Sequence, residues 1–597
     1  MGIIADRILV IDLTTNDHQF IDGANLFAEW IGGVGVGINL LNQYVPSNAD
    51  PLGSDNAIIF AIGSLSTFYP IISKTVTVFR SPLTNDLGES YAGGRLSLAL
   101  RFANIGALVI IGKAKKPSIV TIIKDEVKIR PAGPLAHMYT STIGRVLREL
   151  IPAYPGKRSI LRIGQAGENL VRYSNIVVDT LRHFGRLGAG AVLGSKNLKA
   201  IVISGNQNIS LNQPKIDRRA YSKTYSQIWD LCVNTEVMKK YHVLGTAQNI
   251  LPLNELNALP TKNFLYGKFT KAIEISGEKF IEVYLGRRVS CNTCPVGCIH
   301  VGILRERYGK DLADIHSTSV PYDYEPMVLL GPTLLIGDGK ELMKLLELTE
   351  KYGMDAITTG GVLGYLAEAY EKKIITDSDT GGLPIRFGNV EDFLEVVHQI
   401  ALRTKKNRNL FWWAGEGLDA LVKKYGGSDI ALRFNNHTPA GYSTGPYSMI
   451  GHAIGGRHSH LDNAGYSLDL KLIGKELQPN ENIMKLVKEE EWRNTLNSLV
   501  ICLFARNLYT PQLVVECFRS LGITITEDEL KKIGFAIQEL RIKTKIRFGF
   551  NYQEIKTSIP KRLFEMESGH GKLSKSLVTE YLELYNSILR ERYQIKP

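Results

Sequence analysis

The 597-residue chain is 44% hydrophobic and 22% charged, a composition that can bury a large core and predicts a globular protein of several domains. Its formal net charge is +12, but the basic residues are spread along the chain and no nucleic-acid-binding motif accompanies them. We therefore expect no nucleic-acid partner. An ordinary solvated surface is the first alternative, and a surface that docks an acidic protein is the second.

The apolar segments of the sequence are short or interrupted by charges. No run of about eighteen uncharged apolar residues occurs, and the N-terminal apolar segment contains Asp6, Arg7 and Asp12. We expect neither a membrane span nor a signal peptide, and therefore a cytoplasmic location. The six cysteines are too few for a disulfide scaffold in a chain of this length.

Residues 1–210 are predicted to form a β-rich domain. Short β-branched runs bounded by turn signals predict strands at 8–13, 57–62, 75–79, 107–111 and 119–123. From about residue 211 the apolar spacing becomes that of helices, as at 341–350, 392–401 and 527–540. The predicted fold class is α+β, in which the β-rich domain is followed by two mainly α-helical domains, 211–417 and 418–597. Only a Gly-Glu-Gly turn marks the second boundary.

Half of the cysteines lie within eight positions, at Cys291, Cys294 and Cys298. This C-x2-C-x3-C spacing suits a [4Fe-4S] cluster better than zinc, whose ligands usually come from two separate short motifs. Zinc completed by His300 or by a distant cysteine is one alternative, and inert buried thiols are another. Spacing does not select a fourth ligand, because apolar patterns surround each of the remaining cysteines, Cys232, Cys502 and Cys517.

Three glycine-rich stretches lie in the first predicted domain, at 31–37, 89–95 and 184–196. The first follows a helix-like segment instead of a strand and lacks a well-placed acidic residue, so it supports a dinucleotide-binding site only weakly. Each stretch alone is more often a turn. Together, exposed backbone amides beside Arg or Lys favour a cradle for an extended, phosphate-bearing cofactor.

The order of these motifs carries a resemblance. Gly-Gly-Val-Gly-Val-Gly, Ser-Pro-Leu-Thr followed by Ala-Gly-Gly, the stretch ending in Gly-Ser-Lys-Asn-Leu-Lys-Ala-Ile, the cysteine motif and a distant Leu-x-x-Cys follow one another. In order and spacing they resemble the aldehyde ferredoxin oxidoreductase family of tungsten enzymes, from about residue 8 to beyond Cys502. The resemblance implies a β-rich cofactor-binding domain that holds two pterin dithiolenes, followed by two helical domains that enclose the metal.

The resemblance also implies the cofactors and their ligands. It implies tungsten bis-molybdopterin, one [4Fe-4S] cluster with Cys502 as the fourth ligand, and a magnesium ion that joins the pterin phosphates through the carbonyls of Tyr91 and Leu187. The implied cofactor contacts are Lys74, Tyr91, Ala92, Gly93, Arg186, Leu187, Gly188, Glu350, Met354, Asp355, Arg457, Asn497, Ile501 and Cys502.

The chain departs from the family pattern at several of these positions, and Met354 and Ile501 each replace a leucine. Lys74 stands where the family has arginine, which keeps the charge but loses the bidentate fork. Glu350 replaces an aspartate and has one more methylene of reach. Asn497 replaces another aspartate and is a neutral partner for a pterin ring.

The same resemblance places Tyr324 and Glu325 at the substrate and makes His460 the proton relay, with His458 as the second choice. Because Glu325 lies among apolar residues, we expect a raised pKa that suits a general base or acid. A structural role is the alternative for each: a buried carboxylate for Glu325, and a hydrogen bond to a core carbonyl for either histidine.

The implied function is oxidation of an aldehyde to a carboxylic acid, with electrons passing through the cluster to ferredoxin or to an iron–sulfur partner subunit. The sequence also resembles the branch with tungsten subunits of benzoyl-CoA-type reductases, which is the alternative activity. The absence of a cysteine beside Tyr324 and Glu325 favours the aldehyde. A non-enzymatic iron–sulfur or zinc assembly protein is a third hypothesis. The sequence does not choose between tungsten and molybdenum, nor between a homo-oligomer and a hetero-oligomer.

Overall fold

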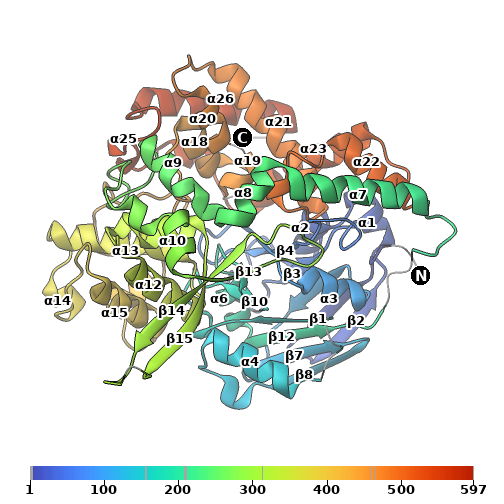
Figure 1. Ribbon diagram of the computed structural model, residues 1–597, viewed down its shortest axis with the longest axis horizontal. Coiled ribbons are helices and arrows are strands. Elements are labelled where there is room, and N and C mark those ends of the chain that lie inside the picture. Colours follow the sequence, from blue (N-terminus) through green and yellow to red (C-terminus); the bar gives the residue numbers. More distant parts are fainter. Residues whose placement is uncertain are drawn as a thin grey trace.

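The computed structural model describes residues 4–595 except 153, 155–156, 180, 208–210, 312, 458, 464 and 558. Two six-stranded sheets lie between Ile8 and Ser204, and helices dominate the rest of the described chain (Figure 1). The α+β fold class predicted from the sequence is confirmed. Among the described helices, none is both long and apolar enough to cross a membrane.

The first sheet has the strand order β2-β1-β6-β3-β4-β5. Only β1 and β6 pair in parallel, and the other neighbours are antiparallel. The strands are β1 (Ile8–Asp12), β2 (Asp17–Ile21), β3 (Ile58–Ala61), β4 (Thr75–Arg80), β5 (Leu87–Ala92) and β6 (Ala107–Ile111). The predicted strands at 8–13, 57–62, 75–79 and 107–111 are therefore present.

The second sheet has the order β11-β10-β9-β12-β7-β8, with β7 and β12 parallel. Its strands are β7 (Ser118–Ile123), β8 (Glu126–Pro131), β9 (Arg158–Arg162), β10 (Ile176–Val178), β11 (Arg182–Phe184) and β12 (Leu198–Ser204). Strand β7 confirms the strand predicted at 119–123.

The two sheets face each other across one apolar core. Successive side chains of a strand point to opposite faces. Leu9 and Phe60 of the first sheet therefore join Leu161 and Ile201 of the second in one cluster. The opposite face of the first sheet packs under helix α2 (Gly33–Tyr44), and that of the second packs under α4 (Thr140–Leu150).

The glycine-rich stretch at 31–37 forms the start of α2, where it approaches another part of the chain. A Cβ at Gly33 would collide with the backbone of Asn497 and Ser498, and the amide of Gly35 donates to Ser498 Oγ at 3.0 Å. These glycines bring the first domain against the segment that carries Asn497 and Cys502.

Helices form most of the chain after residue 211. The helices predicted at 341–350, 392–401 and 527–540 are α12 (Gly339–Tyr352), α15 (Val390–Ala401) and α23 (Glu527–Arg547). One apolar cluster includes side chains on both sides of residue 418. The division into 211–417 and 418–597 stays a prediction, as does the boundary at 210.

A three-stranded antiparallel sheet interrupts the helical region and was not predicted. It has the order β13-β14-β15, formed by β13 (Leu285–Val289), β14 (Ile299–Arg307) and β15 (Ile315–Tyr322). Charged and small polar residues in β13 and β15 hide the strand pattern. The cysteine motif is the loop between β13 and β14.

Candidate active site and cysteine cluster

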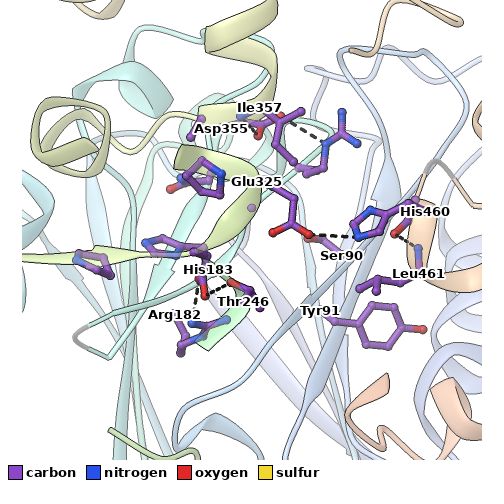
Figure 2. A pocket seen from close by; sticks show the side chains of 18 of the residues that line it. Ser90, Tyr91, Arg182, His183, Thr246, Glu325, Asp355, Ile357, His460 and Leu461 are labelled. Carbon is purple, nitrogen blue, oxygen red and sulfur yellow. Dashed lines mark hydrogen bonds and ion pairs between the residues drawn. The ribbon is translucent and has the colours of Figure 1, made fainter. Parts of the chain in front are cut away.

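A cavity with about 1490 Å³ of empty space, its open mouth included, lies between the first domain and the helical region. Strand β5 contributes Ser90 and Tyr91, and Lys74 directly precedes β4, whereas the segment 175–186 contributes Asn175 and Arg182 among others. Glu325, on α11 (Tyr324–Leu330), and His460 also line the cavity, and their side chains point toward each other (Figure 2).

Most of the cofactor contacts expected from the sequence line this one cavity. They are Lys74, Tyr91, Arg186, Glu350, Met354, Asp355, Arg457, Asn497, Ile501 and Cys502. The remaining four do not line it; they directly follow Tyr91 and Arg186 in the chain and are Ala92, Gly93, Leu187 and Gly188. Segments more than 400 residues apart in sequence thus meet at one site.

Glu325 and His460 form an ion pair. Glu325 Oε1 lies 3.1 Å from His460 Nε2, and the Tyr442 hydroxyl donates to the same oxygen at 2.9 Å. Burial raises the pKa of Glu325, but the bond and charge of His460 and the bond from Tyr442 outweigh it, so the pKa lies below its ordinary value. The raised pKa expected from the apolar sequence context is wrong, because that context does not reveal the two donors.

Tyr324 lies behind this pair, not in the cavity wall. It is fully buried, its hydroxyl donates to the Gly441 carbonyl at 2.6 Å, and its ring packs 4.7 Å from that of Tyr442. Tyr442 is a residue that the sequence analysis did not identify. His458, the second choice for the relay, lies outside the described residues.

A buried ion network supports the floor of the cavity. Arg541 of α23 is fully buried and pairs with Glu89 of β5 and Asp462. Asp462 in turn accepts from Arg457 Nη1 at 2.8 Å and from Asn497 Nδ2 at 3.2 Å. The network therefore orients Arg457 and Asn497, two of the expected cofactor contacts, through Asp462.

Tyr91 completes this support. Its hydroxyl donates to Glu89 at 2.6 Å, and the Arg457 guanidinium lies 4.5 Å from the centre of its ring. Glu89 begins the glycine-rich stretch at 89–95, but no pattern in the sequence indicates that it pairs with Arg541 or that Arg541 pairs with Asp462.

Three further ion pairs line the wall opposite Tyr91. Their distances are 3.3 Å for Arg182–Asp323, 2.6 Å for His183–Glu350 and 3.5 Å for Arg186–Asp355. Burial raises the pKa of Glu350, but the His183 charge and hydrogen bond outweigh it and leave the pKa lowered. Burial dominates at Asp355 and raises its pKa despite Arg186. Arg182, His183 and Asp323 were not singled out in the sequence.

The four expected cluster ligands come from two segments joined through Ile71. The Ile71 amide donates to the Thr293 carbonyl at 3.1 Å, within the cysteine loop, and its carbonyl accepts from the Cys502 amide at 3.2 Å. Burial and the charges of Cys291 and Cys502 raise the pKa of Cys298 to about 12. Thiolates this close together repel one another. These cysteines therefore ionise readily only when a cation, such as a metal ion, offsets the negative charge.

Lys74 and Gly93 lie between the cysteine loop and the cavity. A Cβ at Gly93 would collide with Cys291 Sγ, so this position admits only glycine as the loop is placed. Burial lowers the pKa of Lys74, but the charges of Cys502 and Cys291 outweigh it and raise the pKa overall. One ammonium group thus faces both the cavity and the cysteines.

The other two cysteines are core thiols, as expected. Cys232 and Cys517 are 1% and 0% exposed in an apolar cluster, and burial raises the pKa of Cys232 to about 12. Within the described part of the chain, no group of three or more His, Cys, Asp or Glu side chains is placed to hold a single metal ion.

Unpartnered polar atoms test whether the site fits the implied groups. Asn175 Oδ1 lines the cavity, is buried and has no hydrogen-bond partner among the described residues. Asn292 Nδ2 and Thr293 Oγ1, inside the cysteine loop, are buried and unpartnered in the same way. Buried polar groups without partners are rare unless a bound group supplies them. The free acceptor of Asn175 suits a polar pterin in the cavity. The cysteines, together with the free donors of Asn292 and Thr293, suit an iron–sulfur cluster at the loop.

These features define a class of protein: a redox enzyme whose sheet domain and helical region enclose one polar cofactor cavity beside a four-cysteine site. Family models for this class match almost the whole chain. The N-terminal domain of aldehyde ferredoxin oxidoreductase matches residues 8–205, and domains 2 and 3 match residues 223–596. The chain belongs to the aldehyde ferredoxin oxidoreductase family and is an oxidoreductase.

Individual relatives agree with this assignment. The tungsten-containing aldehyde ferredoxin oxidoreductases of Thermococcus kodakarensis and Pyrococcus furiosus are each 29% identical over 607 residues, which cover 97% of this chain and 95% of theirs. The WOR-like subunit of an aliphatic sulfonate oxidoreductase of Pyrococcus furiosus is 27% identical over 411 residues, covering 66% of this chain and 64% of that subunit.

A solved structure shares the fold. The active site complex BamBC of benzoyl coenzyme A reductase, in complex with 1,5 dienoyl-CoA, matches with a TM-score of 0.79 and 18% identity, over 99% of this chain and 94% of that chain. This likeness supports the architecture of the two sheets and the helical region.

Proposed function

We propose that this chain oxidises an aldehyde to a carboxylic acid with a tungsten bis-pterin cofactor, and passes the electrons through one [4Fe-4S] cluster. The observation that carries the proposal is the convergence of the Glu325–His460 pair, the expected pterin contacts and Cys502 on one cavity. The full-length relatives named as tungsten-containing aldehyde ferredoxin oxidoreductases support the same activity.

The cofactor supplies the redox chemistry when it is bound, by accepting the two electrons that leave the aldehyde. Arg186, Arg457 and Asn497 would hold the pterins from the cavity wall, and Asp355 and Glu350 would accept from their rings. The carbonyls of Tyr91 and Leu187 would hold the magnesium ion. The Leu187 carbonyl already accepts from Ser81 Oγ at 2.8 Å, which leaves one lone pair for an ion.

Glu325 is the general base in this proposal. Its lowered pKa keeps the carboxylate ionised at neutral pH, so it can take a proton from a water molecule that adds to the aldehyde carbon. His460 Nε2 and the Tyr442 hydroxyl both contact Oε1. In its neutral form, the buried His460 takes the proton from the Glu325 carboxyl group through this contact and passes it on. Oxidation of one aldehyde with one water yields the acid, two protons and two electrons.

The test is metal and substrate analysis of protein purified without oxygen. We expect about four irons per chain, the content of one cluster, together with about one tungsten and stoichiometric pterin. We also expect benzaldehyde to reduce a viologen dye, and no turnover of benzoyl-CoA with a low-potential reductant. Activity on benzoyl-CoA alone would replace the aldehyde with the alternative substrate. Zinc without pterin would contradict the proposal altogether.

A further inference from the structure

Helix α8 (Glu236–Leu244) contacts both segments that carry the expected cluster ligands. His242 Nδ1 lies 2.8 Å from the carbonyl of Val296, which stands between Cys294 and Cys298 in the loop. Tyr241 stacks on Phe504, two residues beyond Cys502, with ring centres 4.4 Å apart and planes 5° apart. The His242 side chain is also exposed, so one hydrogen bond links solvent to the cysteine loop.

A side-chain hydrogen bond links α8 to strand β13, and Figure 1 shows both elements near the centre of the molecule. Arg288 Nη2 of β13 donates to the Val243 carbonyl of α8 at 3.4 Å. We define the α8–β13 surface by six exposed residues of the two elements: Val237, Lys239, Lys240, Val243, Arg287 and Arg288. The exposed Glu236 and His242 lie beside them, and Glu236 pairs with Lys239 at 3.2 Å.

This surface is both basic and apolar. Its two elements contain four Lys and Arg residues and one acidic residue, Glu236, so four minus one leaves a net charge of +3. Val237 and Val243 are 57% and 49% exposed on the same helix as the two lysines, so apolar and basic side chains share this surface. Helix α7 (Arg218–Asn234) extends the apolar area with Trp229, which is 41% exposed.

We propose that the α8–β13 surface docks an acidic iron–sulfur protein that takes electrons, one at a time, from the cysteine cluster. The inference rests on the proposed function, because it assumes that a cluster occupies the cysteines. Cations and exposed valines together fit a partner whose acidic rim surrounds an apolar patch, since complementary charge speeds encounter and apolar contact slows dissociation. The contacts of His242 and Tyr241 connect this surface directly to both segments that carry the expected cluster ligands.

The test compares two matched charge reversals in the holoenzyme. Lys239→Glu/Lys240→Glu alters the α8–β13 surface, and Lys405→Glu/Lys406→Glu alters an exposed loop between α15 and α16. The probe is a purified acidic ferredoxin with two [4Fe-4S] clusters. Because electrostatic steering raises association rates by 10- to 1000-fold, we expect the first variant to bind the probe at least about tenfold more weakly at low salt, and the second to bind it like the parent.

Aldehyde-dependent reduction of a viologen dye separates this inference from the proposed function. We expect both variants to keep the parent rate with the dye, whereas only the α8 variant loses ferredoxin reduction. Unchanged binding in the α8 variant, or equal losses in both variants, would overturn the docking surface even if the dye activity is normal. A parent enzyme without dye activity would instead contradict the proposed function.

Discussion

At the scale of single residues, the proposed mechanism depends on the Glu325 carboxylate, and contacts with His460 and Tyr442 lower its pKa. Apolar surroundings alone would keep this carboxyl group protonated at higher pH. The hydroxyl of Tyr442 and the imidazole of His460 both contact Oε1 and reverse that effect. Tyr442 touches Glu325 and not the expected cofactor, so we consider it a positioning residue.

Tyr442→Phe tests this role through the pH dependence of the reaction. A base must be ionised, so activity is present above the pKa of Glu325 and is lost as the pH falls through it. Removal of a hydrogen bond that lowers this pKa raises it. We therefore expect the acid limb of kcat/KM to move to higher pH in Tyr442→Phe, measured with an aldehyde and a viologen dye.

Two further variants serve as controls for the Tyr442→Phe experiment. Tyr466→Phe removes a hydroxyl that bonds to Arg506 at 3.3 Å and not to Glu325, so its acid limb should stay in place. Glu325→Gln removes the base itself, and a loss of about 10²- to 10⁴-fold in rate is expected. A uniform loss of activity in Tyr442→Phe without a shifted limb would show that Tyr442 only fills space.

At the scale of secondary-structure elements, helix α23 ties the helical region to the first sheet. Arg541 is fully buried near the middle of α23, and its partners Glu89 and Asp462 belong to β5 and to the short helix α19 (His460–Asn463). Both partners also bond to expected cofactor contacts, Tyr91 and Arg457. One cation thus fixes the relative positions of three elements around the cavity.

Arg541→Met should destabilise the protein strongly. Removing one member of a buried ionic network leaves uncompensated charge on the others, which costs about 3–5 kcal/mol. Lys543→Met on the same helix is the control, because this exposed lysine pairs only with Glu539 at the surface and should change stability by no more than about 0.5 kcal/mol. Urea denaturation of both variants measures the difference. Equal, small effects would mean that the network is not needed to hold α23.

Local sequence patterns predicted many of the strands and helices, but they did not predict which side chains of different elements contact one another. The β-branched runs predicted strands such as β4, and the motif resemblance placed Arg457, Asn497 and Cys502 at one site before the cavity was known. The Arg541 network, the His183–Glu350 pair and the Tyr442 contact were missed, because each joins residues distant in sequence and local pattern does not show which side chains meet. The polar strands of the β13–β15 sheet were missed because they lack the apolar alternation of a half-buried strand.

At the scale of the whole molecule, the cysteine site connects three regions: the small sheet, the segment after α21 (Pro479–Ser498) and the first domain. The loop of Cys291, Cys294 and Cys298 connects β13 and β14 of the small sheet, whereas Cys502 follows α21. Ile71 bonds to both segments. A cluster bound here would lock all three regions together. Metal binding and assembly of the cavity are therefore expected to be coupled.

Cys502→Ala tests this coupling and the choice of the fourth ligand. We expect the variant to contain fewer than the roughly four irons of a complete cluster and to lose the electron paramagnetic resonance signal of a reduced [4Fe-4S] cluster. Cys232→Ala and Cys517→Ala remove core thiols that lie outside the loop and should keep both the iron and the signal. If the cluster survives in Cys502→Ala and disappears in either core variant, then that core cysteine is the ligand. The Ile71 bridge would then hold the chain together without serving the cluster.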